Sequence, residues 1–204
     1  AMSLEINEKF QHALDVMEKT NKHVFLTGRA GTGKSTLLTY FRGTSHKNHV
    51  VLASTGAAAV NIGGQTVHSF FHFMPDITEV EARRLGRTHQ QTKLIKKLEA
   101  IVIDEVSMVR ADLLDCVDAF LKEARQSKEP FGGIQMIFIG DMYQLPPVVG
   151  KDEVAIFDQL YDSPYFFDSD SFRRISRYEE FYEHIELDKI YRQKDEEFIT
   201  LLNG

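Results

Sequence analysis

The stretch HVFLTGRAGTGKSTLL, residues 23–38, decides the fold of this chain. Its first five residues are mostly apolar or β-branched and predict a buried strand. A G-x-x-x-x-G-K-[ST] pattern then runs from Gly28 to Ser35, and a helical pattern begins at residue 34. Glycines let backbone N–H groups curl around phosphate, and the start of the next helix adds positive potential. The alternative is a glycine-rich turn that merely starts a helix, but a strand before it and a helix after it favour a phosphate-binding loop.

Strands and helices alternate along the rest of the chain. Short apolar segments predict further strands buried on both faces at 50–54, 100–104 and 135–140, with weaker candidates at 166–167 and 184–188. Helical patterns cover residues 5–19, 34–42, 56–62, about 89–98 and 111–125. This order is typical of an α/β domain with a mostly parallel sheet and helices on both faces.

Length, charge and composition limit the classes of protein to which the chain can belong. At 204 residues the chain fits one large domain, and its net charge of −6 argues against nucleic-acid binding driven by bulk electrostatics alone. The single cysteine, Cys116, has helical spacing to Leu113 and Phe120, which predicts a buried thiol, and a lone cysteine suits a reducing compartment. Because no apolar run approaches the roughly 20 residues that cross a bilayer, we expect an intracellular protein without membrane contact.

Polar segments follow each of the four clear strands. The segment after the first is the glycine-rich loop, and the others are STGAAAVNIGG (54–64), DEVSM (104–108) and GDMYQLPP (140–147). In open α/β sheets, ligands bind beyond the carboxyl ends of the strands. The sequence therefore predicts one site built from several strand ends.

The pair Asp104-Glu105 separates reaction classes. An Asp at a strand end can hold Mg²⁺ through water, and a neighbouring carboxylate can orient and activate an attacking water. The alternative is a solvated acidic pair. A nucleotide kinase must exclude water, whereas an ATPase recruits it, and the N-K-x-D base reader of a GTPase does not occur. Lys34 is expected at the β- and γ-phosphates and Ser35 on Mg²⁺.

The segment after the second strand has two interpretations. Ser54 or Thr55 can cap a short alanine-rich helix that ends at Gly63-Gly64, and Thr66 can cap another. Two helix N-termini at one sheet edge would offer donors to an anion such as a nucleic-acid backbone. Equally, the alanines would let a helix pack close to the sheet.

Five segments, in this order, resemble the PIF family of superfamily-one helicases, with RecD-like enzymes as relatives: TGRAGTGKST, STGAAAVNIGGQTVHSFF, IVIDEVSMV, GDMYQLPPV and LDKIYRQ. The resemblance runs from about residue 20 to the end. It implies a RecA-like P-loop NTPase domain in an ATP-driven helicase that translocates 5′→3′ on single-stranded DNA and unwinds duplex junctions. It also implies roles in DNA repair, recombination and telomere or genome maintenance.

The chain stops shortly after LDKIYRQ. We therefore expect residues 1–204 to be the N-terminal motor domain of a longer helicase whose second RecA-like domain is absent from this chain. By the same resemblance, a bacterial version would be cytoplasmic and nucleoid-associated. A non-unwinding P-loop ATPase, such as a DNA translocase or loader, is the alternative, and Glu105 disfavours a binding module without turnover.

The resemblance implies roles for single residues. ATP would be bound by the loop residues Gly28, Ala30, Gly31, Thr32, Gly33, Lys34, Ser35 and Thr36, with Mg²⁺ on Ser35 and Asp104. Catalysis would involve Lys34, Glu105 as the activator of water, and two residues that approach the γ-phosphate, Gln144 and Arg192. Single-stranded DNA would pass Thr55, Gly56, His68 and Ser69.

Four further features are less specific. Gln144 lies in a loop that Pro146 and Pro147 stiffen, although a proline-rich surface turn is the alternative. Gln11 lies where the family places an adenine-reading glutamine, but an exposed helix residue fits equally well. Six basic side chains between residues 83 and 97 could approach DNA, yet a solvated helix is favoured. His68 and His72 have the spacing of a metal pair, but without a third ligand the pattern disfavours a metal site.

Overall fold

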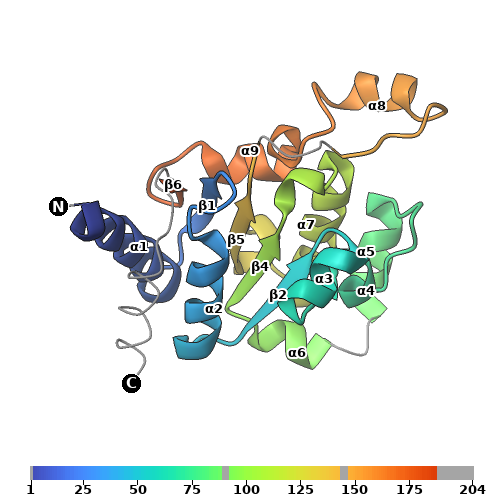
Figure 1. Cartoon of the computed structure of the whole chain (residues 1–204). Coiled ribbons are helices and arrows are strands. Elements are labelled where there is room, and N and C mark those ends of the chain that lie inside the picture. The colour runs from blue at the N-terminus through green and yellow to red at the C-terminus, as the bar shows by residue number, and fades with distance from the viewer. Residues whose placement is uncertain (1, 89–91, 143–146, 188–204) are drawn as a thin grey trace.

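The computed structural model describes residues 2–88, 92–142 and 147–187 (Figure 1). Its centre is a parallel six-stranded sheet with the order β3-β2-β4-β5-β1-β6. The strands are β1 (His23–Gly28), β2 (His49–Ala53), β3 (Gln65–Thr66), β4 (Ala100–Asp104), β5 (Gln135–Gly140) and β6 (Tyr182–Leu187).

Helices cover both faces of the sheet. One face carries α1 (Met2–Lys19) and α2 (Lys34–Thr44). The other carries α4 (Val67–Phe71), α5 (Glu79–Thr88), α6 (Thr92–Lys97), α7 (Ala111–Arg125) and α9 (Asp170–Ser176). The helix α3 (Gly56–Ile62) follows β2, and α8 (Val154–Leu160) projects from the body (Figure 1). Short 3₁₀ turns occur at Val106–Met108, Pro130–Gly133 and Phe166–Asp168.

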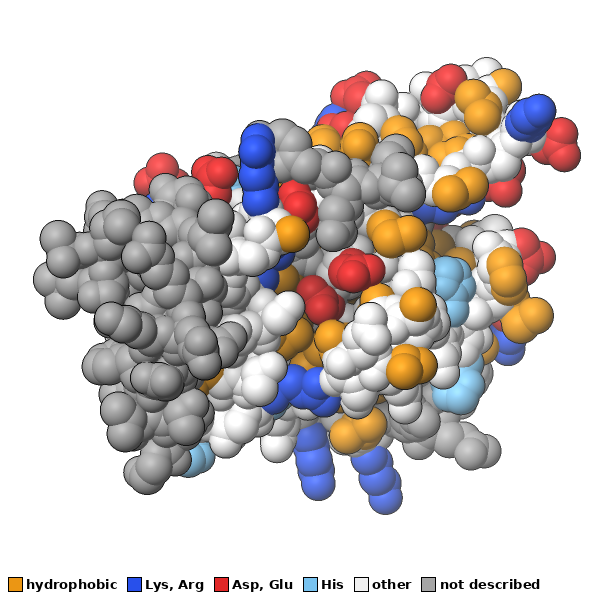
Figure 2. Space-filling view, viewed as in Figure 1, with side chains coloured by type: hydrophobic (Ala, Val, Ile, Leu, Met, Phe, Trp, Pro, Cys, Tyr) orange, Lys and Arg blue, Asp and Glu red, His pale blue; other side chains and the backbone are white. Residues whose placement is uncertain are grey.

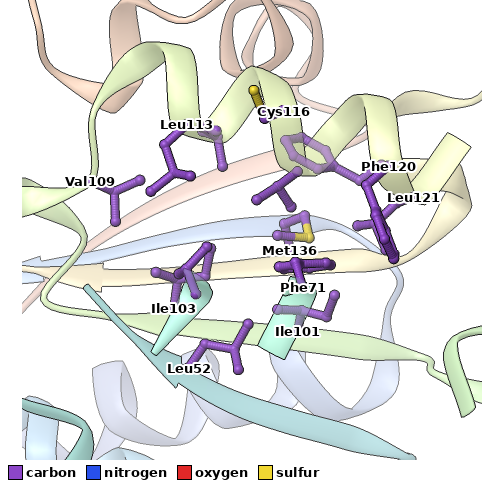
Figure 3. Close-up of a cluster of buried hydrophobic side chains, with 14 of the residues drawn as sticks. Leu52, Phe71, Ile101, Ile103, Val109, Leu113, Cys116, Phe120, Leu121 and Met136 are labelled. Atoms are coloured by element: carbon purple, nitrogen blue, oxygen red, sulfur yellow. The ribbon is translucent and has the colours of Figure 1, made fainter. Parts of the chain in front are cut away.

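The central strands are apolar on both faces because each face meets a helical layer. Ile101 and Ile103 of β4 face α7, whereas Val102 between them faces the α1 and α2 layer. Figure 3 shows Leu113 and Phe120 of α7 lying over these isoleucines. This double burial explains why the predicted strands at 100–104 and 135–140 are confirmed with the same bounds.

One sequence expectation is wrong, and one helix, α5, was not expected. Residues 166–167 form a 3₁₀ turn rather than a strand, because Phe166 is buried edge-on against Phe25 and close to Phe138 without joining the sheet. The helix expected at about 89–98 is confirmed by α6, and residues 89–91 of that range lie outside the described residues. The 10-residue helix α5 precedes it and has few apolar residues to mark it. A capping signal does mark it: Thr78 is followed three residues later by Glu81, whose N–H donates to the Thr78 hydroxyl at 3.2 Å.

Cys116 is buried on α7, as predicted, and burial raises the pKa of its thiol to about 12. A thiol that stays protonated at neutral pH is a poor nucleophile and a poor metal ligand. Within the described ranges, none of the helices has the length and apolarity needed to span a membrane.

His23, at the start of β1, is held in its neutral form. Burial lowers the pKa of this imidazole to about 4. Its Nδ1 accepts a hydrogen bond from the backbone N–H of Met136 at 3.0 Å, so protonation of Nδ1 would break this contact between β1 and β5.

We expect this histidine to make the fold sensitive to acid. The unfolded state, with an ordinary histidine pKa near 6.5, binds a proton before the folded state does, so stability falls as pH drops from about 6.5 to 4. The loss reaches about 3 kcal/mol for one proton across this window. Urea unfolding at pH 7 and pH 4 should show a smaller pH dependence in His23→Gln than in the parent. Equal pH dependence in both proteins would contradict the assignment.

Candidate active site

A pocket of about 390 Å³ opens where three strands end. Its walls come from the loop after β1, the start of α2 and the ends of β4 and β5: Ala30, Gly31, Gly33, Lys34, Ser35, Thr36, Asp104, Glu105, Gly140 and Asp141. The volume is within the range of small-molecule sites. Figure 2 shows acidic side chains exposed in a hollow near the middle of this face. Three of the four predicted strand ends therefore meet at one pocket.

The loop after β1 has a conformation that requires glycine. Gly31 and Gly33 have φ values of 81° and 100°, in the region that side chains with a Cβ avoid. Thr32 fixes the turn between them, because its hydroxyl donates to the carbonyl of Arg29 at 2.7 Å. The backbone groups of this loop are thereby held in a tight curl at the pocket wall.

Gly28 is needed for a different reason, close packing. A Cβ at this position would collide with the Thr32 hydroxyl and would lie 2.7 Å from the carbonyl oxygen of Leu187 on β6. Both neighbours belong to rigid parts of the structure, since Thr32 is tied to Arg29 and Leu187 belongs to the sheet.

We therefore expect Gly28→Ala to displace the loop. Overpacking of this kind costs about 1–3 kcal/mol of stability, and the displaced loop should bind nucleotide more weakly. The matched control is Gly43→Ala. Gly43 lies in α2, the helix that follows the loop, and a Cβ added there would meet open space. Melting and nucleotide titration of both variants test the expectation, which fails if the two variants behave alike.

Lys34 lies across the mouth of its own loop. Its ammonium donates to the carbonyl of Gly28 and to that of Arg29, the latter at 2.9 Å. Burial lowers the pKa of Lys34, while Asp141 and Asp104 act in the opposite direction by favouring the charged form. A partly desolvated cation hydrogen-bonded to carbonyl oxygens can exchange them for the oxygens of a phosphate.

Asp104 and Glu105 end β4 in a strained turn. Glu105 has φ 51°, a left-handed conformation that costs a residue with a side chain about 1–2 kcal/mol. Its backbone N–H donates to Asp104 Oδ1 at 2.9 Å, which fixes that carboxylate. Burial raises the pKa of Asp104, opposed by this hydrogen bond and by Lys34. Local strain at a pocket wall is characteristic of functional sites.

Asp141 is an acidic pocket residue to which the sequence motifs assign no role. It is 8% exposed, lines the pocket and acts electrostatically on Lys34. A signal was present in the sequence, because Asp141 follows the end of β5 as Asp104 closes β4.

The residues predicted to lie along DNA are placed beside this pocket rather than in it. Thr55 caps α3 by accepting from the N–H of Ala58 at 3.3 Å, and Thr66 caps α4 by accepting from that of Ser69 at 3.0 Å. Gly56 and Ser69 are exposed, whereas Thr55 and His68 are half-buried. The packing interpretation is confirmed for α3, whose buried face is made of Ala58 and Ala59.

Other predicted residues lie apart from the pocket. Gln11 is exposed on α1 and donates to Asp15 at 2.9 Å, so its adenine-reading role stays a prediction. Gln144 and Arg192 lie outside the described residues. The arginines of α5 are paired with acidic side chains, as in Arg83–Glu79, which fits a solvated helix. Within residues 2–88, 92–142 and 147–187, no group of three His, Cys, Asp or Glu side chains could hold a metal ion.

Two larger pockets, of about 500 and 470 Å³, lie over α5, α7, α8 and α9. The most buried carboxylate of the larger one, Asp115, already accepts hydrogen bonds from the hydroxyl of Tyr161 at 2.8 Å and the N–H of Ser171 at 2.8 Å. Neither pocket has a glycine-rich loop. The smaller pocket at the strand ends is therefore the better candidate for chemistry.

Known proteins are similar to this chain in sequence and in fold. The chain matches the family model described as PIF1-like helicase over residues 2–203. It is 40% identical over 148 residues to the ATP-dependent DNA helicase Pif1 of Bdellovibrio bacteriovorus, an alignment that covers 71% of this chain and 34% of that protein.

Solved structures agree with the sequence match. Pif1 from Bacteroides sp in complex with ADP-AlF4 superposes with a TM-score of 0.79 at 40% identity, covering 96% of this chain and 45% of that chain. Bacteroides Pif1 bound to ssDNA superposes with a TM-score of 0.77 at 38% identity, covering 97% and 45%. This chain thus spans about a third of that curated relative and less than half of each solved chain. The chain belongs to the PIF1-like helicase family.

Proposed function

We propose that residues 1–204 form the N-terminal RecA-like motor domain of an ATP-dependent DNA helicase that moves 5′→3′ on single-stranded DNA. The observation that carries the proposal is the pocket where the glycine-rich loop, Lys34, Asp104 and Glu105 meet. Family membership supplies the substrate class, because the relatives are named ATP-dependent DNA helicases. A second RecA-like domain of the same full-length chain and DNA duplex junctions are the partners in this proposal.

In this proposal the loop binds the ATP phosphates. Ala30, Gly31, Gly33 and the N-terminus of the 11-residue helix α2 line the pocket. Their backbone N–H groups would bind phosphate oxygens. Lys34 would leave the carbonyls of Gly28 and Arg29 to bind the β- and γ-phosphates. This exchange keeps the ammonium hydrogen-bonded in both states.

The oxygen donors of the pocket fit Mg²⁺. Ser35 and Asp104 both line it, and hydroxyl and carboxylate oxygens are ligands that this hard cation prefers. Because the described residues hold no three-ligand cluster, phosphate oxygens and water would complete the coordination, as is usual for Mg²⁺. When bound, the ion would neutralise charge on the phosphates. Its charge would also favour the ionised form of Asp104, against the effect of burial.

Glu105 would activate the attacking water. Its carboxylate belongs to the same pocket wall as Ser35 and Asp104, so a water at the γ-phosphate would lie within its reach. The left-handed backbone conformation of Glu105 sets the direction of its Cα–Cβ bond. Gln144 and Arg192 would approach the γ-phosphate, as the family resemblance implies.

Single-stranded DNA would pass the starts of α3 and α4. Gly56 and Ser69 are exposed there, and Thr55 and His68 are half-buried beside them. Parallel pairing of β2 and β3 places both helix starts at the same sheet edge as the nucleotide pocket. Support for DNA as the ligand comes from the family, of which one solved member is described as bound to ssDNA.

Strand displacement by the full-length protein tests this function. Duplexes with a 5′ or a 3′ single-stranded tail should be separated in the presence of ATP only when the tail is 5′, and single-stranded DNA should stimulate ATP hydrolysis. Stimulated hydrolysis without strand separation from either tail would indicate a translocase instead. ATP binding without turnover would contradict the proposal as a whole.

A further inference from the structure

The end of α2 is joined to the end of α3 by one side chain. Arg42, in the last turn of α2, donates from Nη1 to the carbonyl of Ile62 and from Nη2 to that of Gly63 at 3.5 Å. These carbonyls lie at the C-terminal end of α3, where helix acceptors lack partners within the helix. A guanidinium remains charged and presents several donors in one plane, which suits two adjacent carbonyls. Among the hydrogen bonds of the described residues, those that join α2 to α3 come from Arg42.

Apolar packing reinforces the same junction. Ile62 packs against the core cluster that includes Leu37 and Phe41 of α2, and also against the alanine cluster of β2 and α3. Just after it, a Cβ at Gly64 would lie 2.5 Å from the carbonyl oxygen of Val51, so this backbone sits directly on β2. The C-terminal end of α3 is therefore fixed to α2 and to the sheet together.

The opposite ends of the two helices carry the proposed binding groups. Helix α2 begins with Lys34 and Ser35 in the nucleotide pocket, and α3 begins behind the cap Thr55 with the exposed Gly56 (both helices are labelled in Figure 1). A shift of α2 when the phosphates change would reach α3 through their joined ends, because helices move as rigid units.

We propose that Arg42 is a positioning residue that couples the nucleotide state of α2 to the DNA-binding start of α3. This inference rests on the proposed function. Arg42 is exposed and lines neither the pocket nor the proposed DNA path. Its loss should therefore leave folding, nucleotide affinity and basal turnover nearly unchanged while it weakens the coupling between the two ligands.

The test measures that coupling in the full-length protein. The affinity for an oligothymidylate is determined with and without a non-hydrolysable ATP analogue, and the ratio of the two dissociation constants reports the coupling. Allosteric ratios are typically 5–150-fold. Arg42→Ala should bring the ratio to within about twofold of one. Arg42→Lys, which keeps a charge that can reach one carbonyl, should give an intermediate ratio.

A matched control separates coupling from general surface effects. Arg87→Ala removes another exposed arginine, one that pairs with Glu123 on α7 and not with α3, and it should keep the parental ratio. All three variants should melt close to the melting temperature of the parent. If Arg42→Ala melts at a lower temperature, the coupling ratio of Arg42→Lys is compared with that of Arg87→Ala, and a lower ratio in Arg42→Lys supports the inference. An unchanged ratio in Arg42→Ala, or an equal fall in Arg87→Ala, overturns the inference. If the parent itself shows neither coupling nor DNA-stimulated turnover, the proposed function fails along with it.

Discussion

Replacing Glu105 by glutamine should slow ATP hydrolysis at least ~10²-fold, the low end for loss of a general base. Nucleotide affinity should stay nearly unchanged, because the loop backbone and Lys34 provide the phosphate contacts. Glutamine has nearly the same size and can occupy the same strained turn, but it cannot accept a proton from the attacking water. Phosphate release under single-turnover conditions, together with titration of a fluorescent ATP analogue, measures both quantities.

The control for this experiment is Glu81→Gln on α5. The Glu81 side chain is 45% exposed and pairs with Arg84, and Glu81 does not line the pocket, so its replacement removes one carboxylate without touching the site. It should hydrolyse ATP like the parent. Normal turnover in Glu105→Gln would remove Glu105 from the catalytic role and leave Asp104-Glu105 as a solvated acidic pair.

Lys34→Ala should weaken ATP binding by about 10–100-fold. A hydrogen bond to a charged group is worth about 1.5–3 kcal/mol, and each 1.4 kcal/mol corresponds to a factor of ten in affinity. The folded state should tolerate the change, because the Arg29 carbonyl keeps its hydrogen bond from the Thr32 hydroxyl and Lys34 lines an open pocket that water can enter. Titration of the same fluorescent analogue checks the affinity.

Lys96→Ala is the matched control for charge. Lys96 is exposed on α6, a helix that does not line the pocket, so its loss changes the net charge equally without removing a phosphate contact. If Lys34→Ala and Lys96→Ala bind nucleotide with equal affinity, the ammonium at the loop mouth does not contact phosphate.

The sequence predicts the centre of the sheet well because burial there leaves a local pattern. β4 and β5 are covered on both faces, so their residues are apolar apart from Asp104 and Gln135 at the ends, and the bounds of both strands can be predicted from the sequence alone. The edge strand β3 has two residues, Gln65 and Thr66, and forms only because β2 lies next to it. No local apolar pattern marks such a strand. Phe166 shows the opposite case, in which an apolar pair predicts a strand but is buried in a 3₁₀ turn outside the sheet.

The site, too, is predictable in the parts that leave a local sequence pattern and not in the others. Parallel strands bring their carboxyl ends to one edge, so the meeting of the glycine-rich loop with Asp104 and Glu105 could be predicted from the order of strands and motifs. The contact of Lys34 with its own loop carbonyls and the burial of Asp141 could not. They depend on side-chain direction and on distances between separate segments, as does the bridge from Arg42 to α3.

The rate of phosphate release by the full-length protein, with and without single-stranded DNA, tests the central claim most directly. We predict slow release with ATP and Mg²⁺ alone, a severalfold increase when an oligothymidylate is added, and loss of both activities in Glu105→Gln. A protein that binds ATP but releases phosphate at the same rate with and without DNA would contradict the assignment of this pocket to a DNA-driven motor.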